Sequence, residues 1–274
     1  MLKMADNTCH FGLNNLFADS GLAAHDNTTR LYFPADPLQM RAIVERVFFE
    51  RGLRFVFSTR AKVPWVLKEE CVQAKGEGEG KEKGEKEKEK EKEKEKEKEK
   101  EKEKEKEKEK EKEKEKEKEK EKGKGEVKGK FFDPEEGYVF VPGKDEVICA
   151  AGNGEGEGYV VAYGEMLYRA WDAVLRCRRE GRMVGLVNKP TLNVVDEEMI
   201  KKIGHSPFVL VVESLNQKTG LGSKYGTWLL ERGLTPRYGY MGSTKEGCGG
   251  LWEQIPHQGL DSESIVERIK QLAM

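Results

Sequence analysis

Phe208-Val209-Leu210-Val211-Val212 is a run of five apolar residues with no polar interruption. An unbroken run of this length predicts a central strand that is covered on both faces of its sheet. On its carboxyl side, residues 220–232 predict a helix and residues 236–240 a further strand. Asp261 is a suitable N-cap for a last helix, because its carboxylate accepts hydrogen bonds from the first turn.

The segment before this run shows the same alternation. Residues 158–163 and 183–187 predict strands, and the apolar residues over 166–177 recur at helical spacing. Asp196 is the expected N-cap of a helix whose first turn is acidic, which suits the helix dipole. Strands that alternate with helices indicate an α/β sheet with crossover connections.

Two turns in this part of the chain contain glycine. Residues 138–141 and 146–149 read as the strands of a hairpin around Pro142-Gly143. Gly220-Leu221-Gly222-Ser223 opens a helix, where backbone N–H groups are able to bind an anion. It lacks the spacing of a phosphate-binding P-loop, so close packing is the preferred interpretation.

The N-terminal part predicts a strand, a helix and a second strand. Residues 30–33 form the first β-prone run, and Asp36 with Pro37 is a typical helix start. Apolar residues that share one helical face follow: Met40, Ile43, Val44, Val47 and Phe48. Residues 53–57 then alternate into a predicted buried strand. This is a βαβ unit with Ser58-Thr59-Arg60 at the carboxyl end of its second strand, where open α/β sheets bind ligands.

Residues 85–122 alternate Glu and Lys without interruption, with nineteen of each. The run has no apolar side chain to bury, and whether it is helical or coiled stays open. Taking these residues from the 50 basic and 51 acidic residues of the chain leaves 31 and 32, an ordinary charge content. We therefore predict three parts: residues 1–74, a low-complexity linker at 75–130, and a domain at 131–274.

The composition excludes several classes of function. A net charge of −1 gives no electrostatic case for a nucleic-acid partner. No apolar stretch approaches the roughly 20 residues of a membrane span, and the N-terminus lacks the apolar core of a signal peptide. The five cysteines form no CxxC and the four histidines are scattered, so no metal site is predicted and a cytoplasmic location is expected.

Three motifs occur in order in the C-terminal part: Lys189-Pro190-Thr191-Leu192 followed by Asp196-Glu197-Glu198, Val211-Val212-Glu213 followed by Gly220-Leu221-Gly222-Ser223, and Gly259-Leu260-Asp261-Ser262-Glu263-Ser264-Ile265. Together they resemble the C-terminal domain of transketolases, enzymes that use thiamine diphosphate. In the N-terminal part, Phe33-Pro34-Ala35-Asp36 and Ser58-Thr59-Arg60-Ala61-Lys62-Val63-Pro64 resemble the end of the pyrimidine-binding domain of the same family. The implied fold is α/β: a partial pyrimidine-domain βαβ unit, the charged linker, and a three-layer α/β domain.

The resemblance also implies roles for four residues. Cys9-His10-Phe11-Gly12 resembles the family's Thr-His-Asp segment, so His10 would contact the substrate or the cofactor. Arg60 would hold the phosphate of a sugar phosphate, which suits a guanidinium that forks two donors onto phosphate oxygens. Asp19 and His25 are weaker counterparts of an acidic and a histidine residue in a substrate loop. From the residues alone, a surface arginine or structural ion pair explains Arg60 equally well, a partly buried, hydrogen-bonded histidine explains His10 at least as well, and a loop residue is the preferred interpretation of His25.

The family's diphosphate- and Mg²⁺-binding motif, Gly-Asp-Gly, does not occur in the chain. The glutamate that binds the aminopyrimidine lies, by position, upstream of Cys9. The resemblance therefore implies the C-terminal portion of an enzyme that transfers two-carbon ketol units between sugar phosphates, inactive by itself. The alternatives are a subunit of a split transketolase, with cofactor and metal bound through a partner chain, or a non-catalytic dimerisation or interaction module. A homodimer, a truncated gene product and an incomplete gene model all remain open.

Overall fold

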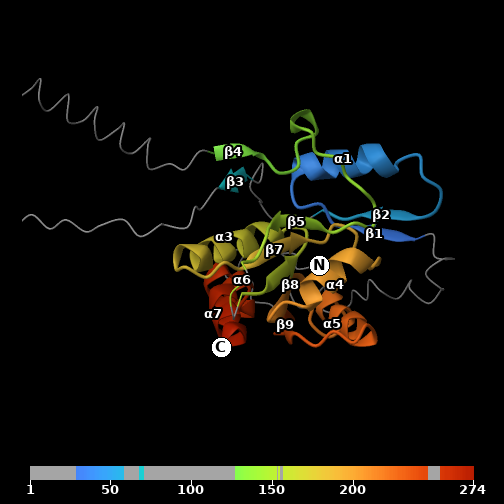
Figure 1. Cartoon of the computed structure of the whole chain (residues 1–274). Helices are drawn as coiled ribbons and strands as arrows, with labels where there is room; N and C mark the ends of the chain where they lie inside the picture. Colours follow the sequence, from blue (N-terminus) through green and yellow to red (C-terminus); the bar gives the residue numbers. More distant parts are fainter. Residues whose placement is uncertain (1–28, 59–67, 71–126, 153, 155–156, 246–253) are drawn as a thin grey trace, which may run out of the picture. The chain divides into compact units, whose positions relative to one another are not determined.

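The computed structural model describes residues 29–58, 68–70, 127–152, 154, 157–245 and 254–274 (Figure 1). In chain order the elements are β1 (Arg30–Tyr32), α1 (Pro37–Val47), β2 (Arg54–Val56), β3 (Lys68–Glu70), β4 (Val127–Lys130), the 3-10 helix η2 (Pro134–Glu136), β5 (Glu146–Cys149), β6 (Tyr159–Ala162), α3 (Met166–Arg179), β7 (Gly185–Asn188), α4 (Glu197–Gly204), β8 (Phe208–Asn216), α5 (Leu221–Glu231), β9 (Arg237–Ser243), α6 (Gln254–Gln258) and α7 (Ser262–Ala273).

The described residues within Met1–Glu69 and Gly129–Met274 form one compact unit, called here the first unit. The first unit contains the βαβ unit β1–α1–β2 and a five-stranded sheet in the order β5-β7-β6-β8-β9. Strands β7, β6, β8 and β9 are parallel, whereas β5 pairs antiparallel with β7. The prediction of a mixed α/β fold with crossovers is confirmed.

Strand β8 is an interior strand of this sheet, as the apolar run predicts. It lies between β6 and β9, and its first eight residues are buried. Val209 and Val211 pack into a core with Ile200 and Ile203 of α4 and Leu221 of α5. Helices α3 and α7 contact each other and cover the sheet on the other side (Figure 1). The sheet is thus the middle of three layers.

Strand β1 joins the two parts of this unit through the segment that follows β7. The Phe33 N–H donates to the Pro190 carbonyl, and the Leu192 N–H donates to the Leu31 carbonyl. The side chain of Asn193 accepts from the Leu31 N–H at 3.1 Å. Leu31 and Phe33 also belong to the apolar core of the large sheet. The Lys-Pro-Thr-Leu segment therefore holds the βαβ unit in place.

The predicted N-caps at Asp36, Asp196 and Asp261 are confirmed. The carboxylate of Asp36 accepts from the Gln39 N–H at 2.8 Å. Asp196 accepts from two N–H groups of α4, and Asp261 accepts from the first turn of α7. These contacts are local, within three residues of the cap, and a sequence pattern is enough to identify them.

Two expectations are wrong in part. Residues 138–141 are not a strand, because Phe140 packs instead against Tyr32 and Ile43 beneath α1. β5 pairs with β7 and forms no hairpin with this segment. The predicted strand at 53–57 exists as β2, but it is not buried: Phe55 is 42% exposed. Of the apolar residues predicted to share one helical face, Val44 on α1 and Phe48 at its C-cap are exposed, at 39% and 72%.

Replacing residues 85–122 by a short Gly/Ser linker is expected to leave the thermal midpoint of the first unit unchanged. The run has no apolar side chain with which to pack on that unit. Differential scanning calorimetry of both proteins checks this. A drop of several degrees would correspond to a loss of about 1 kcal/mol or more and would show that the run stabilises the fold.

Candidate functional site

The four residues predicted from the family resemblance, His10, Asp19, His25 and Arg60, lie outside the described residues. The structure therefore neither brings them together nor separates them, and their roles stay predictions. Ser58, which opens the Ser58-Thr59-Arg60 segment, is described and exposed just beyond β2. The surroundings of Ser58 show what stands next to the predicted phosphate-binding segment.

Ser58 borders a hollow beyond the carboxyl ends of several parallel strands. The hollow encloses about 280 Å³, including space open to solvent. It is lined by Phe33, Pro34, Phe57, Ser58, Tyr163, Gly164, Glu165 and Ser214. These residues follow β1, β2 and β6 or lie near the end of β8. Because this volume includes open solvent, it overstates the room for a ligand, and the hollow suits a part of a ligand at most.

One wall of the hollow is a cluster of aromatic rings. Phe33 stacks on Phe57 with ring centroids 4.4 Å apart, and Tyr163 meets Phe33 edge-on at 5.1 Å. Glu165 adds a buried carboxylate, which lies 4.0 Å from the guanidinium of Arg169. The wall connects the βαβ unit with the large sheet, so a ligand held at Ser58 would touch both.

Beneath this wall, the carboxylate of Glu213 occupies the N-terminus of α5. It accepts hydrogen bonds from the N–H groups of Leu221 and Gly222 and from the hydroxyl of Tyr163, each at 2.7 Å. Glu213 has no exposed surface, and burial raises its pKa to about 7 although the three donors lower it. The sequence pattern suggested that the N–H groups at the start of α5 could bind an external anion. In the structure they bind the carboxylate of Glu213 instead.

Close packing of the Gly220–Gly222 turn is confirmed. A Cβ on Gly220 would lie 2.2 Å from Glu213 Oε2, and a Cβ on Gly222 would lie 2.6 Å from Tyr240 Cβ. Both distances are far below normal contact. The turn is thus a structural element that fits around Glu213 and β9.

Another buried carboxylate, that of Glu146, joins α1 to the edge of the large sheet. It accepts from the hydroxyl of Tyr138 at 2.5 Å and from the side-chain amides of Gln39 and Asn188 at 2.8 Å each. These partners come from α1, β7 and the segment before β5. Burial raises the pKa of Glu146 to about 7, while the three hydrogen bonds lower it.

The raised pKa of Glu146 leads to a prediction about pH. Because the folded pKa exceeds the ordinary value of 4.5, the contribution of Glu146 to stability is complete below pH 4.5 and is lost as the pH rises through 7. When the pH is lowered from 8 to 5, the free energy of unfolding of the native protein should therefore rise by up to about 3 kcal/mol more than that of Glu146→Gln. Urea unfolding of both proteins at the two pH values measures this. A difference that does not change with pH would contradict it.

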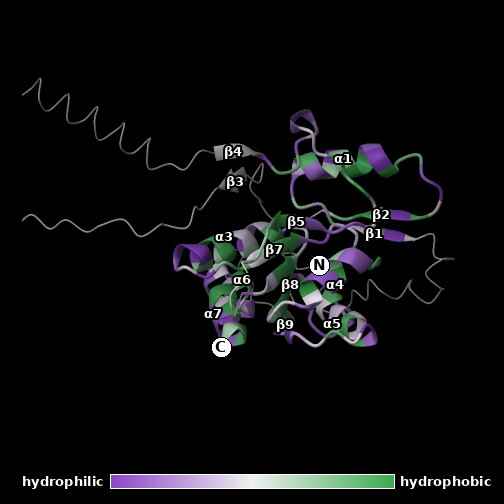
Figure 2. Cartoon of the chain, viewed as in Figure 1, coloured by the Kyte–Doolittle hydropathy of each residue, from purple (hydrophilic) through white to green (hydrophobic). Residues whose placement is uncertain are grey.

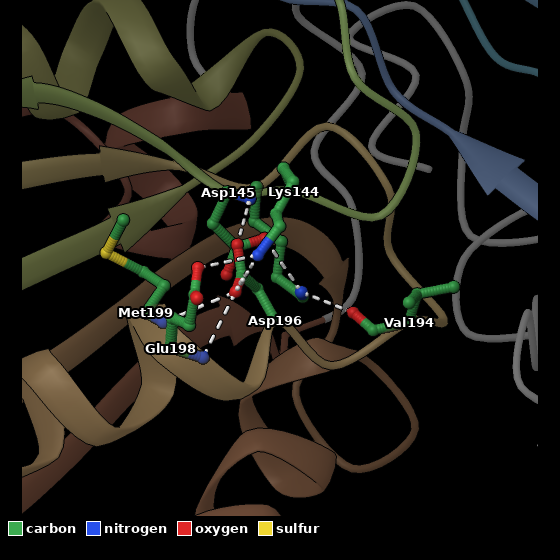
Figure 3. A network of polar contacts seen from close by, with 7 residues as sticks. Lys144, Asp145, Val194, Asp196, Glu198 and Met199 are labelled. Carbon is green, nitrogen blue, oxygen red and sulfur yellow. Dashed lines mark hydrogen bonds and ion pairs between the residues drawn. The ribbon is translucent and has the colours of Figure 1, made fainter.

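A third polar network surrounds Lys189 (Figure 3). Its ammonium donates to Asp145 Oδ1 at 3.0 Å and to the Val194 carbonyl at 2.7 Å, and neither side chain of the ion pair is exposed by more than 1%. Asp196 Oδ2 accepts from the Asp145 N–H at 3.0 Å, while Lys144 bridges Asp196 and the exposed Glu198. Burial raises the pKa of Asp145, and the Lys189 charge lowers it. The network fixes the segment from 189 to 196 that holds β1.

The buried carboxylates Glu146 and Asp145 are not predicted from the sequence, and Lys189 and Glu213 enter there only as parts of motifs. Glu146 opens the predicted strand at 146–149, and Glu213 directly follows the apolar run at 208–212. These two positions are the signal that could have identified both carboxylates from the sequence. Among the described residues, no three His, Cys, Asp or Glu side chains come together to hold a metal ion. None of the described helices is long and apolar enough to cross a membrane.

Comparison with known proteins gives the same family as the motifs. Residues 155–244 match the family model described as transketolase, C-terminal domain. A subunit of the apulose-4-phosphate transketolase of Actinobacillus succinogenes is 29% identical over 134 residues, which are 47% of this chain and 42% of that protein. A putative transketolase C-terminal section of Methanocaldococcus jannaschii is 29% identical over 141 residues, 50% of this chain and 42% of that protein. The matches thus span less than half of each relative.

Solved structures show the same fold. A split gene transketolase, described as an inactive beta4 tetramer, superimposes with a TM-score of 0.58 at 17% identity, covering 90% of this chain and 57% of that one. The transketolase of Campylobacter jejuni superimposes with a TM-score of 0.54 at 11% identity, and the match covers 97% of this chain and 29% of that one. The chain therefore contains a transketolase C-terminal-like domain.

Proposed function

We propose that this chain is the C-terminal portion of a transketolase-type enzyme and works with a second polypeptide that carries the diphosphate-binding domain. The observation that carries the proposal is the match of residues 155–244 to the transketolase C-terminal domain, and a relative that is 29% identical is named as one subunit of a transketolase. A similar fold occurs in a split gene transketolase whose beta4 tetramer is described as inactive. Inactivity without a partner is what we propose for this chain as well.

The sequence supports a partner that holds the diphosphate and its Mg²⁺, because its 274 residues contain no Gly-Asp-Gly, the motif through which the resembling family binds them. We therefore assign thiamine diphosphate and Mg²⁺ to the partner chain. The part proposed for this chain is to hold the sugar phosphate at Arg60, which follows Ser58 by two residues in the sequence. A charge-assisted contact of this kind is worth roughly 1.5–3 kcal/mol.

Reconstitution tests the proposal. The purified chain is mixed with a polypeptide of the same organism that contains Gly-Asp-Gly, and ketol transfer from a ketose phosphate to an aldose phosphate is followed. Neither protein should turn over alone, and the mixture should. Activity of this chain alone, or inactivity of the assembled complex with its cofactor bound, would contradict the proposal.

Within the active complex, Arg60→Ala should raise KM for the sugar phosphate roughly tenfold or more, with a smaller change in kcat. Arg60→Lys should recover only part of this, because an ammonium lacks the two-pronged fork. Arg182→Ala, at an exposed arginine beyond α3, is the matched control and should leave KM unchanged. An unchanged KM in Arg60→Ala would reduce Arg60 to a surface charge.

We also propose that the protein works in the cytoplasm. The described cysteines, Cys149 and Cys177, are both free thiols, which suits a reducing compartment. Fractionation of cells with an antibody against the chain tests this, and recovery in a secreted or membrane fraction would contradict it.

A further inference from the structure

Two buried polar atoms near the Lys189 network have no hydrogen-bond partner among the described residues. One is the hydroxyl of Tyr225 on α5, whose side chain is only 1% exposed. The other is Asp145 Oδ2, whereas the Oδ1 of the same carboxylate binds Lys189. Buried polar groups are almost always paired with the protein or with an ordered water, because leaving them unsatisfied is costly. The two atoms therefore indicate a bound group between them.

Several contacts bring these two atoms into one neighbourhood. The ring centroids of Tyr225 and Trp228 lie 5.9 Å apart, and Lys189 Nζ lies 5.6 Å from the centroid of the same Trp228 ring. The Lys189 ammonium in turn donates to Asp145 at 3.0 Å. Burial, and then the charge of Asp145, raises the pKa of the Tyr225 hydroxyl well above its usual value. The hydroxyl therefore stays protonated at neutral pH and is able to donate.

Lys189 has a further donor at the same place. Of the three N–H groups of an ammonium, one donates to Asp145 Oδ1 and one to the Val194 carbonyl. The described residues provide no acceptor for the third. The contact with the Trp228 ring is a cation–π contact close to the limit of about 6 Å, and it uses no hydrogen bond. One N–H of Lys189 is therefore available to the group that Tyr225 and Asp145 require.

The surroundings favour a neutral molecule over an ion. Lys144 and Lys189 balance Asp145 and Asp196, so the buried part of the network has no net charge. Glu198, which also pairs with Lys144, is 88% exposed and remains in contact with solvent. Strand β7, which leads directly into Lys189, is buried and mainly apolar (Figure 2). An added ion would leave an unbalanced charge in this interior, which is costly, whereas a neutral hydrogen-bonding molecule leaves none.

We propose that one water molecule binds among Tyr225, Asp145 and Lys189. It accepts from the Tyr225 hydroxyl and from the third N–H of Lys189, and it donates to Asp145 Oδ2. About three hydrogen bonds are usual for a buried water. The water satisfies each of these polar groups and connects α5 with the segment from 189 to 196 that holds β1. The site needs neither a partner chain nor a cofactor, so it stands apart from the function proposed above.

A crystal structure of the full chain, at a resolution that shows ordered waters, tests the site directly. It should contain a single water within about 2.5–3.0 Å of both Tyr225 Oη and Asp145 Oδ2. A direct hydrogen bond between these two oxygens would overturn the proposal. Separated oxygens with no electron density between them would overturn it as well.

Tyr225→Phe gives a second test in solution, because the sign of its effect depends on the water. If the hydroxyl donates to a bound water, its removal should lower the thermal midpoint by about 2–4 °C. If the hydroxyl were unsatisfied, its removal would leave the midpoint unchanged or raise it, which would overturn the proposal. Tyr240→Phe, at a half-buried tyrosine of β9, is the matched control and should leave the midpoint unchanged. Scanning calorimetry of the three proteins measures these shifts.

Discussion

Glu213→Ala should lower the free energy of unfolding by about 2–5 kcal/mol. The substitution leaves the buried N–H groups of Leu221 and Gly222 without their acceptor, and each such group costs about 1–3 kcal/mol. The hydroxyl of Tyr163 loses its partner as well. For a domain of this size the thermal midpoint should fall by roughly 5–15 °C, which calorimetry at pH 7.5 measures.

Two controls separate the helix contact from a general effect of removing charge. Glu213→Gln keeps one acceptor oxygen, so its loss should lie between those of the native protein and the Ala variant. Glu198→Ala removes a carboxylate that is 88% exposed and pairs with Lys144, and it should change stability by less than about 0.5 kcal/mol. Equal losses for Glu213→Ala and Glu198→Ala would show that Glu213 does not anchor α5.

Lys189→Met should cost about 3–5 kcal/mol at pH 7.5, because it leaves the carboxylate of Asp145 buried without its ammonium partner. In this variant the pKa of Asp145, already raised by burial, should rise further. A raised folded pKa gives stability that is present at low pH and lost as the pH rises, so the cost should shrink by pH 5.5. Urea unfolding at the two pH values measures both effects.

The double variant Lys189→Met with Asp145→Asn is the control for this pair. Because neither position of the pair then carries a charge, the double variant should recover more than half of the unfolding free energy that Lys189→Met loses. A single-variant loss below about 1 kcal/mol, or a double variant as unstable as the single one, would contradict the assignment of a tightly coupled buried pair.

Elements whose signals are local could be predicted from the sequence. Asp36, Asp196 and Asp261 cap helices within three residues of themselves, and the run at 208–212 carries its own evidence of burial. The positions of α3, β7 and β9 agree with the pattern to within a few residues. Propensity and periodicity decide such elements before the rest of the chain is considered.

Features that depend on distant residues could not be predicted. Residues 138–141 have the apolar content of a strand, but Phe140 is needed to cover α1, almost one hundred residues away in sequence. The partners of Glu146 and Asp145 are likewise decided by tertiary contacts, with Gln39 107 residues from Glu146 and Lys189 44 residues from Asp145. The pattern at 53–57 predicts that Phe55 is buried, but Phe55 is 42% exposed because β2 has only one neighbouring strand among the described residues, β1.

For the candidate site, the sequence pointed to the carboxyl ends of the strands, and the structure places Ser58 at a hollow there. The sequence could not predict the aromatic wall, since Phe33, Phe57 and Tyr163 each follow a different strand and meet only in the folded chain. The roles of His10, Asp19, His25 and Arg60 remain predictions, because these residues lie outside the described part of the chain.

The central claim is that this chain supplies the C-terminal portion of a transketolase-type enzyme and leaves the cofactor to a partner. Isothermal titration of thiamine diphosphate with Mg²⁺ into the purified chain, and then into the chain mixed with the Gly-Asp-Gly polypeptide, tests it most directly. We predict no binding heat for the chain alone up to about 1 mM cofactor, the weak limit of specific affinity. The mixture should bind one cofactor for each pair of chains. Micromolar binding by the chain alone would contradict the claim.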